Sequence, residues 1–233
     1  MDIIPVIDLK GGLVVRAVAG DRARYRPLDT PLAPGRQDAA AIAEGYRALF
    51  PFASLYVADL DAIGGAGDNR ASMAALQDVW PGDVWLDAGL AVTRDLAPRI
   101  VPVVGSESLL VEGLCALVDL AAPQGRTDVL SLDFRGESFI GPAELLATPV
   151  LWPERVIVMS LTHVGTDGGP DLARVRQIAA AAGFDRRVYA AGGVRHRDDV
   201  RALRDAGAAG ALVATAMHSG ALSRRDLDAI AQW

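Results

Sequence analysis

The feature that most constrains the fold is a regular alternation of short apolar runs with segments of helical spacing. The first run ends at Asp8, and seven more follow at residues 54–59, 83–87, 100–104, 129–133, 155–160, 187–191 and 211–214. Short apolar runs bounded by Gly, Pro and Asp are typical of strands buried on both faces. Apolar residues recur at helical spacing in residues 38–50, 69–79, 107–120, 143–146, 171–182, 197–206 and 224–232.

Strict alternation of strands and helices predicts a parallel sheet, and eight such units in 233 residues favour a closed barrel. We therefore expect residues 1–233 to form a single domain with the (βα)₈ or TIM-barrel fold. The third helix, residues 93–97, is barely one turn before Pro98 ends it. The alternative is an open doubly wound sheet, which needs a phosphate loop after the first strand. Residues 10–13, Lys-Gly-Gly-Leu, match neither the dinucleotide nor the P-loop pattern.

Composition narrows the class of protein. Hydrophobic residues make up 51% and charged residues 22%, without an apolar run long enough to cross a bilayer, so we expect a globular protein without membrane segments. The early Asp2 argues against a secretory signal, and the single Cys115 favours the reducing cytoplasm over a disulfide scaffold. The net charge is -6 and the arginines are scattered, so a nucleic-acid partner is not expected.

Carboxylates end four of the eight predicted strands, namely Asp8, Asp59, Asp87 and Asp133. In a parallel barrel these ends meet at one mouth, where crowded carboxylates raise one another's pKa. They imply a general acid and base, a bound cation or a cationic substrate. Asp8, Asp87 and Asp133, with His163 as a further candidate, would suit Mg²⁺ or Mn²⁺ better than Zn²⁺, and no other cofactor is expected.

Small residues follow the last two strands instead of acids. Gly192 and Gly193 come after the seventh strand and Thr215 after the eighth, the places where barrels often bind phosphate. A simple tight turn is the alternative for the glycine pair. We expect a phosphorylated small molecule as the ligand. The charged loop at residues 20–27, which contains Arg22, Arg24 and Arg26, is a candidate lid.

Six motifs, in order along nearly the whole chain, resemble the HisA/HisF superfamily of histidine-biosynthesis isomerase and cyclase barrels. They are residues 5–16 with Gly20-Asp21, residues 56–61 with Asn69, Val104-Gly105-Ser106-Glu107, Ser131-Leu132-Asp133, residues 162–168, and Ala191-Gly192-Gly193-Val194. The resemblance implies a barrel of two similar half-barrels, each with one catalytic Asp at its first strand end.

In the isomerase branch, the resemblance makes Asp8 the general base and Asp133 the general acid of an Amadori rearrangement, which converts an aminoaldose into an aminoketose. Thr162 and Asp167 carry over as catalytic-site residues, five positions apart as in the family. The substrate or phosphate contacts that we expect from the family motifs are Gly105, Ser106, Gly192 and Gly193, and Thr215 joins them because of its place after the eighth strand. Arg16, Asp59, Asp87 and His163 are candidate modifiers of the site.

Several positions depart from the family pattern. Asp87-Ala88-Gly89 replaces the glycine triplet of the first phosphate site, and a carboxylate there opposes a bound phosphate. Thr166 replaces an arginine, His163 an aspartate, and Ala214-Thr215-Ala216 a glycine motif with a basic residue. The second phosphate site fits the pattern, whereas the first phosphate site, and with it the bisphosphorylated histidine-pathway substrate, does not.

Three segments resemble a divergent HisA/HisF-related subgroup from organisms that make tetrahydromethanopterin for one-carbon metabolism: residues 9–12 (Leu-Lys-Gly-Gly), residues 19–27 and residues 58–63. We therefore expect acid–base isomerisation, or related chemistry, of a phosphorylated small molecule outside the histidine pathway. Three alternatives stay open: a divalent-metal-assisted enzyme of pterin or one-carbon cofactor biosynthesis, the phosphoribosylformimino-aminoimidazole carboxamide ribotide isomerase of histidine biosynthesis, and a non-catalytic ligand-binding relative. The sequence does not indicate an oligomeric state.

Overall fold

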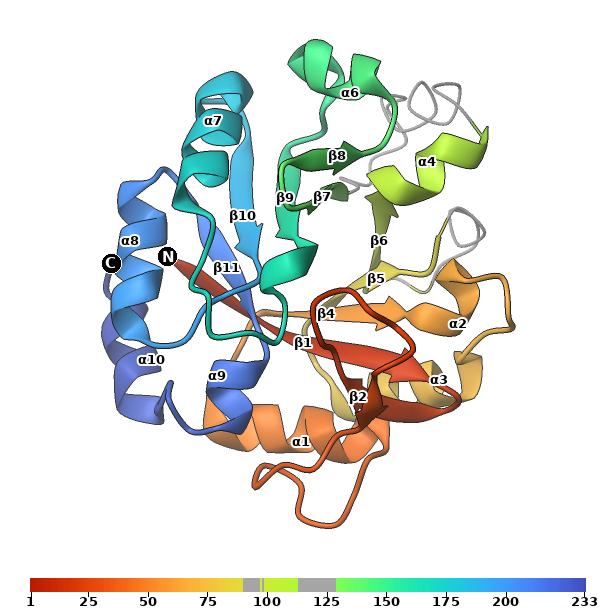
Figure 1. The fold of residues 1–233 in the computed structure, drawn as a ribbon. Helices are drawn as coiled ribbons and strands as arrows, with labels where there is room; N and C mark the ends of the chain where they lie inside the picture. Colours follow the sequence, from red (N-terminus) through yellow and green to blue (C-terminus); the bar gives the residue numbers. More distant parts are fainter. Residues whose placement is uncertain (90–96, 98, 113–128) are drawn as a thin grey trace.

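Eight parallel strands form a closed barrel in the computed structural model, which describes the chain except for residues 90–96, 98 and 113–128 (Figure 1). The barrel strands, in order around the ring, are β1 (Asp2–Lys10), β4 (Ser54–Asp59), β5 (Asp83–Asp87), β6 (Ile100–Gly105), β7 (Val129–Arg135), β9 (Arg155–Ser160), β10 (Arg187–Ala191) and β11 (Gly210–Val213). β1 pairs with β4 on one side and with β11 on the other, which closes the ring. The predicted (βα)₈ barrel is confirmed.

The two-residue period of the strands divides their side chains between two cores. Inward-facing residues such as Tyr56, Trp85 and Tyr189 pack together inside the barrel, and the Trp85 and Tyr189 rings meet edge to face with centroids 4.9 Å apart. Outward-facing residues such as Leu55 and Val57 pack under the helices. At the C-terminal end of the barrel, the inward positions are polar and form the candidate site.

Helices cover the outside of the barrel. They are α1 (Ala39–Leu49), α2 (Leu60–Ile63), α3 (Arg70–Val79), α4 (Ser106–Glu112), α6 (Ala143–Ala147), α7 (Leu172–Ala182), α8 (Arg197–Asp205), α9 (Thr215–His218) and α10 (Arg224–Ile230), with 3₁₀ turns η1 (Pro149–Leu151) and η2 (Leu161–His163). Side chains of Asp38, Asp171 and Ser223 cap three of the helix N-termini. None of the helices in the described ranges is long and apolar enough to cross a membrane.

Some of the sequence predictions fall wholly or partly outside the described residues. The predicted helix at 107–120 is observed as α4, which begins one residue earlier, at Ser106. The second half of the predicted helix, with Cys115, lies outside the described residues. Most of the predicted short helix at 93–97 also lies outside the described residues.

The first strand of each half-barrel is followed by an antiparallel partner, and the two hairpins correspond. β1 pairs with β2 (Leu13–Arg16) so that Asp8 lies opposite Val15. β7 pairs with β8 (Ser138–Ile140) so that Asp133 lies opposite Ile140, at the same separation along the chain. A third short strand, β3 (Arg26–Pro27), extends the first hairpin. Asp8 and Asp133 therefore occupy equivalent places in two similar half-barrels.

Candidate active site

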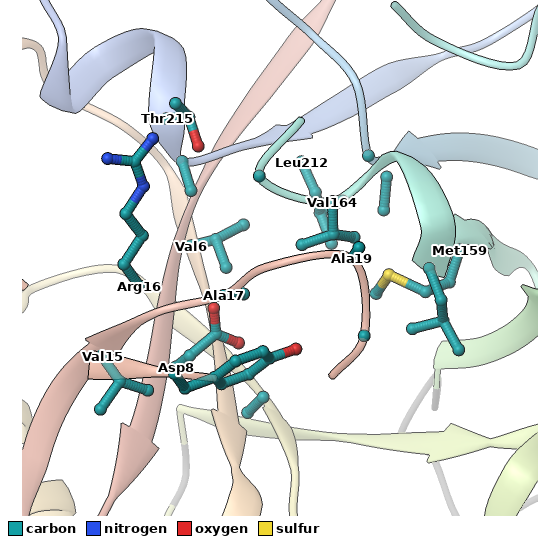
Figure 2. Close-up of a pocket in the computed structure, with 18 of the residues that line it drawn as sticks. Val6, Asp8, Val15, Arg16, Ala17, Ala19, Met159, Val164, Leu212 and Thr215 are labelled. Carbon is teal, nitrogen blue, oxygen red and sulfur yellow. The ribbon is translucent and has the colours of Figure 1, made fainter. Parts of the chain in front are cut away.

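The C-terminal ends of the barrel strands surround a cavity of about 660 Å³, part of which is drawn in Figure 2. Both half-barrels contribute to its wall. The residues that the sequence singled out and that line the cavity are Asp8, Arg16, Asp87, Gly105, Asp133, Gly192, Gly193 and Thr215. The structure thus brings three acids and the expected anion-binding groups into one chamber.

Asp133 is the most firmly held of the three acids. Its Oδ1 accepts a hydrogen bond from the Ser131 hydroxyl (2.7 Å), and its Oδ2 accepts one from the Glu107 backbone N–H (3.0 Å). The Ser106 Oγ lies 3.2 Å from Oδ2 and also accepts from the Asp133 backbone N–H (2.9 Å). Burial raises the pKa of Asp133 to about 6, and these hydrogen bonds oppose the rise.

Asp8 differs from Asp133 in its surroundings. Its carboxylate lines the cavity and makes no hydrogen bond or ion pair with any described residue. Burial raises the pKa of Asp8 to about 7, and the Arg22 guanidinium opposes this rise. A carboxyl with a pKa near the working pH, and with free oxygens, is suited to accept and return a proton.

Asp87 lies on the same side of the cavity as Asp133. Its Oδ2 accepts a hydrogen bond from the Tyr56 hydroxyl (3.2 Å), and its Oδ1 accepts one from the Gly89 backbone N–H (3.3 Å). A Cβ at Gly105 would lie 3.6 Å from Asp87 Oδ2 and 3.3 Å from Asp133 Oδ2, so Gly105 separates the two carboxylates. Burial first, and the Asp133 charge second, raise the pKa of Asp87 to about 7.

The three acids do not form a metal-ligand set. Within the described ranges, no group of three or more His, Cys, Asp or Glu side chains is arranged to hold a metal ion. Asp8, Asp87 and Asp133 face one cavity, and the hydrogen bonds of Asp87 and Asp133 come from Tyr56 and from serine and backbone donors. Asp87 and Asp133 are thus held by hydrogen-bond donors of the protein itself.

The opposite side of the cavity carries the residues that the sequence predicted to bind an anion. Gly192 and Gly193 have positive φ angles of 100° and 83°, and a Cβ at Gly192 would lie 2.6 Å from the Ser160 carbonyl oxygen, so a side chain would not fit. Thr215 follows β11, and Figure 2 shows the Arg16 guanidinium extending toward it. Neither the Arg16 nor the Thr215 side chain has a hydrogen-bond partner in the described part of the chain.

His218 braces this side of the cavity. The Tyr46 hydroxyl donates to the Val6 carbonyl (2.9 Å), so its oxygen accepts from His218 Nε2, 2.8 Å away. His218 Nδ1 then accepts from the Thr30 hydroxyl at 3.0 Å. Burial lowers the pKa of His218 to about 4, and the ring is neutral at pH 7. The ring is a fixed support that links α9 to β1.

Five of the residues singled out in the sequence do not line the cavity. Asp59 faces outward, caps α2 and bonds to the Asn69 backbone and side chain. Ser106 lies behind Asp133 and positions it. Thr162 and His163 lie in η2, where His163 Nδ1 bonds to the Gly169 carbonyl, and Asp167 is exposed to solvent. From this loop Thr166 lines the cavity instead.

The lid was predicted at residues 20–27, of which Arg26 and Pro27 form β3. Residues 17–25, which we call the strap, line the cavity through Ala17, Ala19, Gly20, Asp21, Arg22 and Tyr25. The Ala19 backbone N–H donates to the Val164 carbonyl (2.8 Å) in the second half-barrel. Arg22 forms an ion pair with Glu107 at 3.1 Å, and Lys10 Nζ donates to the Arg22 carbonyl (2.8 Å). Of the three arginines expected in the lid, Arg22 lines the cavity, and Arg24 and Arg26 bond within or beside the strap.

Several side chains that line the cavity were not singled out from the sequence, among them Tyr25, Tyr56, Glu107 and Arg135. The strand period could have found Tyr56, because it lies two residues before Ala58 on the inward face of β4. Arg135 could have been found by comparing the half-barrels, since it follows Asp133 by two residues as Lys10 follows Asp8. Tyr25 and Glu107 lie in a loop and at a helix start, where no period applies.

Comparison with known proteins gives long, weak matches. A family model described as histidine biosynthesis protein matches residues 150–223. Relatives from Rubrobacter xylanophilus and Acidothermus cellulolyticus are 32% and 30% identical, over 98% and 100% of this chain and 96% and 98% of their own lengths. Both are named 1-(5-phosphoribosyl)-5-((5-phosphoribosylamino)methylideneamino) imidazole-4-carboxamide isomerase. A protein from Methanocaldococcus jannaschii, named only as uncharacterized, is 26% identical over 97% of both chains.

Proposed function

This chain belongs to the HisA/HisF superfamily of histidine-biosynthesis barrels, as a HisA-like isomerase, and on that premise we propose that it isomerises a singly phosphorylated aldose-type substrate by acid–base catalysis. Asp133 is the general acid and Asp8 the general base. The observation that carries this proposal is the equivalent placement of the two acids in one cavity, one held by donors and one without a partner in the described residues.

The chemistry needs one acid and one base, each of which gives and takes a proton in turn. A protonated Asp133 donates its proton to the ring oxygen of the sugar, which opens the ring to an imine. Asp8 then removes the proton from C2 of the protonated imine, and the electron pair moves to form the enolamine. The enolamine becomes the aminoketose when Asp8 returns a proton to C1 and the C2 hydroxyl gives its proton to the ionised Asp133. Each well-placed acid or base contributes on the order of 10² to 10⁴ in rate.

The phosphate binds at the side of the cavity formed by Gly192, Gly193 and Thr215. Arg16 supports this placement because its guanidinium has no carboxylate partner among the described residues and extends toward Thr215. Because His218 is neutral at pH 7, Arg16 supplies the positive charge on that side of the cavity. We propose one phosphate site only, because Asp87 lies where the family pattern places the glycine triplet of the first phosphate site.

The test is exchange of the C2 proton. The protein is mixed with a panel of phosphorylated N-glycosylamines in D₂O, and loss of the C2 proton signal is followed by NMR. We expect Asp8→Asn to abolish exchange without lowering the melting temperature, because Asp8 makes no hydrogen bond that Asn would lose. Asp83→Asn, an exposed acid at the far end of β5, is the control. An Asp8→Asn protein that keeps exchange would refute this mechanism.

The histidine-pathway isomerase is the second candidate, and the names of the Rubrobacter xylanophilus and Acidothermus cellulolyticus relatives favour it. Complementation of a histidine auxotroph that lacks this isomerase decides between the two. Growth would assign the pathway substrate and place a second phosphate beside Asp87. The link to tetrahydromethanopterin and one-carbon metabolism is a proposal on motif resemblance alone, and genes for that pathway beside this one would support it.

A further inference from the structure

Asp87 is an acid in the cavity that the proposed reaction does not use. It faces the cavity from the end of β5, and no described cationic side chain forms an ion pair with it. Its hydrogen-bond donors are a neutral hydroxyl, Tyr56, and one backbone N–H, from Gly89. A buried carboxylate without a cation is unfavourable, so this position calls for a positively charged or N–H donor group from outside the chain.

The neighbouring charges meet this need only in part, because the Arg22 guanidinium lowers the pKa of Asp87 less than the Gly89 and Tyr56 hydrogen bonds do. Glu107 is neutralised by Arg22 at 3.1 Å, and Asp133 has its own set of donors. The negative charge of Asp133 raises the pKa of Asp87 and therefore disfavours the ionised form of Asp87. Apolar side chains of Leu60 and Ile63 line the cavity beside Tyr56, and they give this side of the cavity a wall suited to a carbon skeleton.

We propose that Asp87 and the Tyr56 hydroxyl bind a nitrogen-bearing group of the substrate, an amine, amidine or amino-substituted ring, so that the substrate is anionic at one end only. This inference rests on the proposed function, because it concerns the same cavity. It divides the cavity into an anion side, at Gly192, Gly193 and Thr215, and a cation side at Asp87. A bisphosphorylated substrate would place its second phosphate against the Asp87 carboxylate.

A direct test compares two sets of probes at a pH of about 8. One set consists of ω-aminoalkyl phosphates of increasing chain length, and the other of the matching alkanediol bisphosphates. Binding to the full-length protein is measured by calorimetry. We expect the best aminoalkyl phosphate to bind at least about tenfold more tightly than the matching bisphosphate, because only the amine is attracted to Asp87.

Two variants locate the effect. Asp87→Asn keeps an acceptor for Tyr56 and loses the charge, so we expect it to bind the aminoalkyl phosphate about tenfold more weakly, with inorganic phosphate binding unchanged. Asp83→Asn, on the same strand at the opposite end of the barrel, removes the same charge far from the cavity and should leave both probe sets unchanged.

The other outcomes are equally informative. A preference for the bisphosphate, or an amine preference that survives Asp87→Asn, would overturn the inference and leave the proposed isomerase intact. Mn²⁺ binding that depends on Asp87, without amine binding, would overturn it in favour of a metal. Absence of inorganic phosphate binding, together with absence of C2 exchange, would instead remove the proposed function.

Discussion

Asp8 and Asp133 occupy equivalent strand positions, yet the residue two places before each of them differs. Val6 precedes Asp8, and Ser131 precedes Asp133. The Ser131 hydroxyl donates to Asp133 at 2.7 Å, and a valine has no donor to offer. This difference accounts in part for a pKa of about 6 at Asp133 and about 7 at Asp8. The half-barrels thus supply one fixed acid and one unrestrained acid.

We expect Ser131→Ala to raise the pKa of Asp133 by about one unit, because the lost hydrogen bond favours the ionised carboxylate. A general acid acts in its protonated form, so the basic limb of the pH–kcat profile should move to higher pH by a similar amount. C2 exchange measured across the pH range checks this. Ser138→Ala, an exposed serine on β8, is the matched control. An unmoved basic limb in Ser131→Ala would argue against Asp133 as the acid.

How far a single residue can be located from the sequence depends on its surroundings. Asp8, Asp87 and Asp133 each end an apolar run, so strand period and barrel geometry place them at one mouth. His218 could not be placed in this way. Its ring bonds to Thr30 and Tyr46, residues 188 and 172 positions away, which only the closed barrel brings to it. Contacts of that range leave no local pattern.

At the scale of elements, the strap connects the two half-barrels above the cavity through the hydrogen bond from the Ala19 backbone N–H to the Val164 carbonyl. Its path depends on Gly165, which has a φ of 66° and lies against the Ala17 carbonyl of the strap. A Cβ at Gly165 would overlap that carbonyl oxygen, so the strap and the loop after β9 fit only because residue 165 is a glycine.

We expect Gly165→Ala to push the strap away from the cavity and to raise KM about tenfold or more, because Arg22 and the strap backbone would no longer cover the substrate. Steady-state kinetics check this expectation. Gly65→Ala is the matched control, since Gly65 has the same φ of 66° with nothing within 4 Å of an added Cβ. Gly65→Ala places an alanine at the same unfavourable positive φ as Gly165→Ala does, but its Cβ meets no neighbouring atom. Equal KM values for the two variants would contradict a covering role.

At the scale of elements, the sequence predicted most of the barrel. The strands at 54–59, 83–87, 155–160 and 187–191 have the predicted bounds, because turn residues delimit each apolar run. The short elements β8 and α9 were missed. β8 has three residues and is held by pairing with β7, and α9 is a single turn after β11. Such elements owe their structure to neighbours and not to a period of their own.

For the whole molecule, the cavity acids make stability depend on pH. The pKa values of Asp8, Asp87 and Asp133 rise from 3.8 to about 7, 7 and 6 on folding. Between about pH 4 and pH 7 the folded protein therefore binds more protons than the unfolded chain, and the free energy of unfolding falls as pH rises. His218, lowered from 6.5 to about 4, acts in the opposite direction, but it is one group against three.

We therefore expect the melting temperature to fall between about pH 5 and pH 8, and Asp87→Asn to reduce this fall. At about pH 8 the variant should be more stable than the wild type by on the order of 1 kcal/mol, or about 2–4 °C, because an amide need not ionise. Thermal denaturation at both pH values checks this, with Asp83→Asn as the control. If the melting temperature of Asp87→Asn fell as steeply as that of the wild type, Asp87 would not be a cause of the fall.

The pairing of β1 with β11 also bears on how the protein is made. Asp2 pairs with Gly210, so one edge of β1 has no partner until the last strand has left the ribosome. During most of translation the growing chain carries an open strand edge, which invites pairing with other chains. The residues proposed to bind the phosphate are synthesised just before that strand (Gly192 and Gly193) and just after it (Thr215). The cavity and the closed barrel are consequently completed together, in one late step of folding.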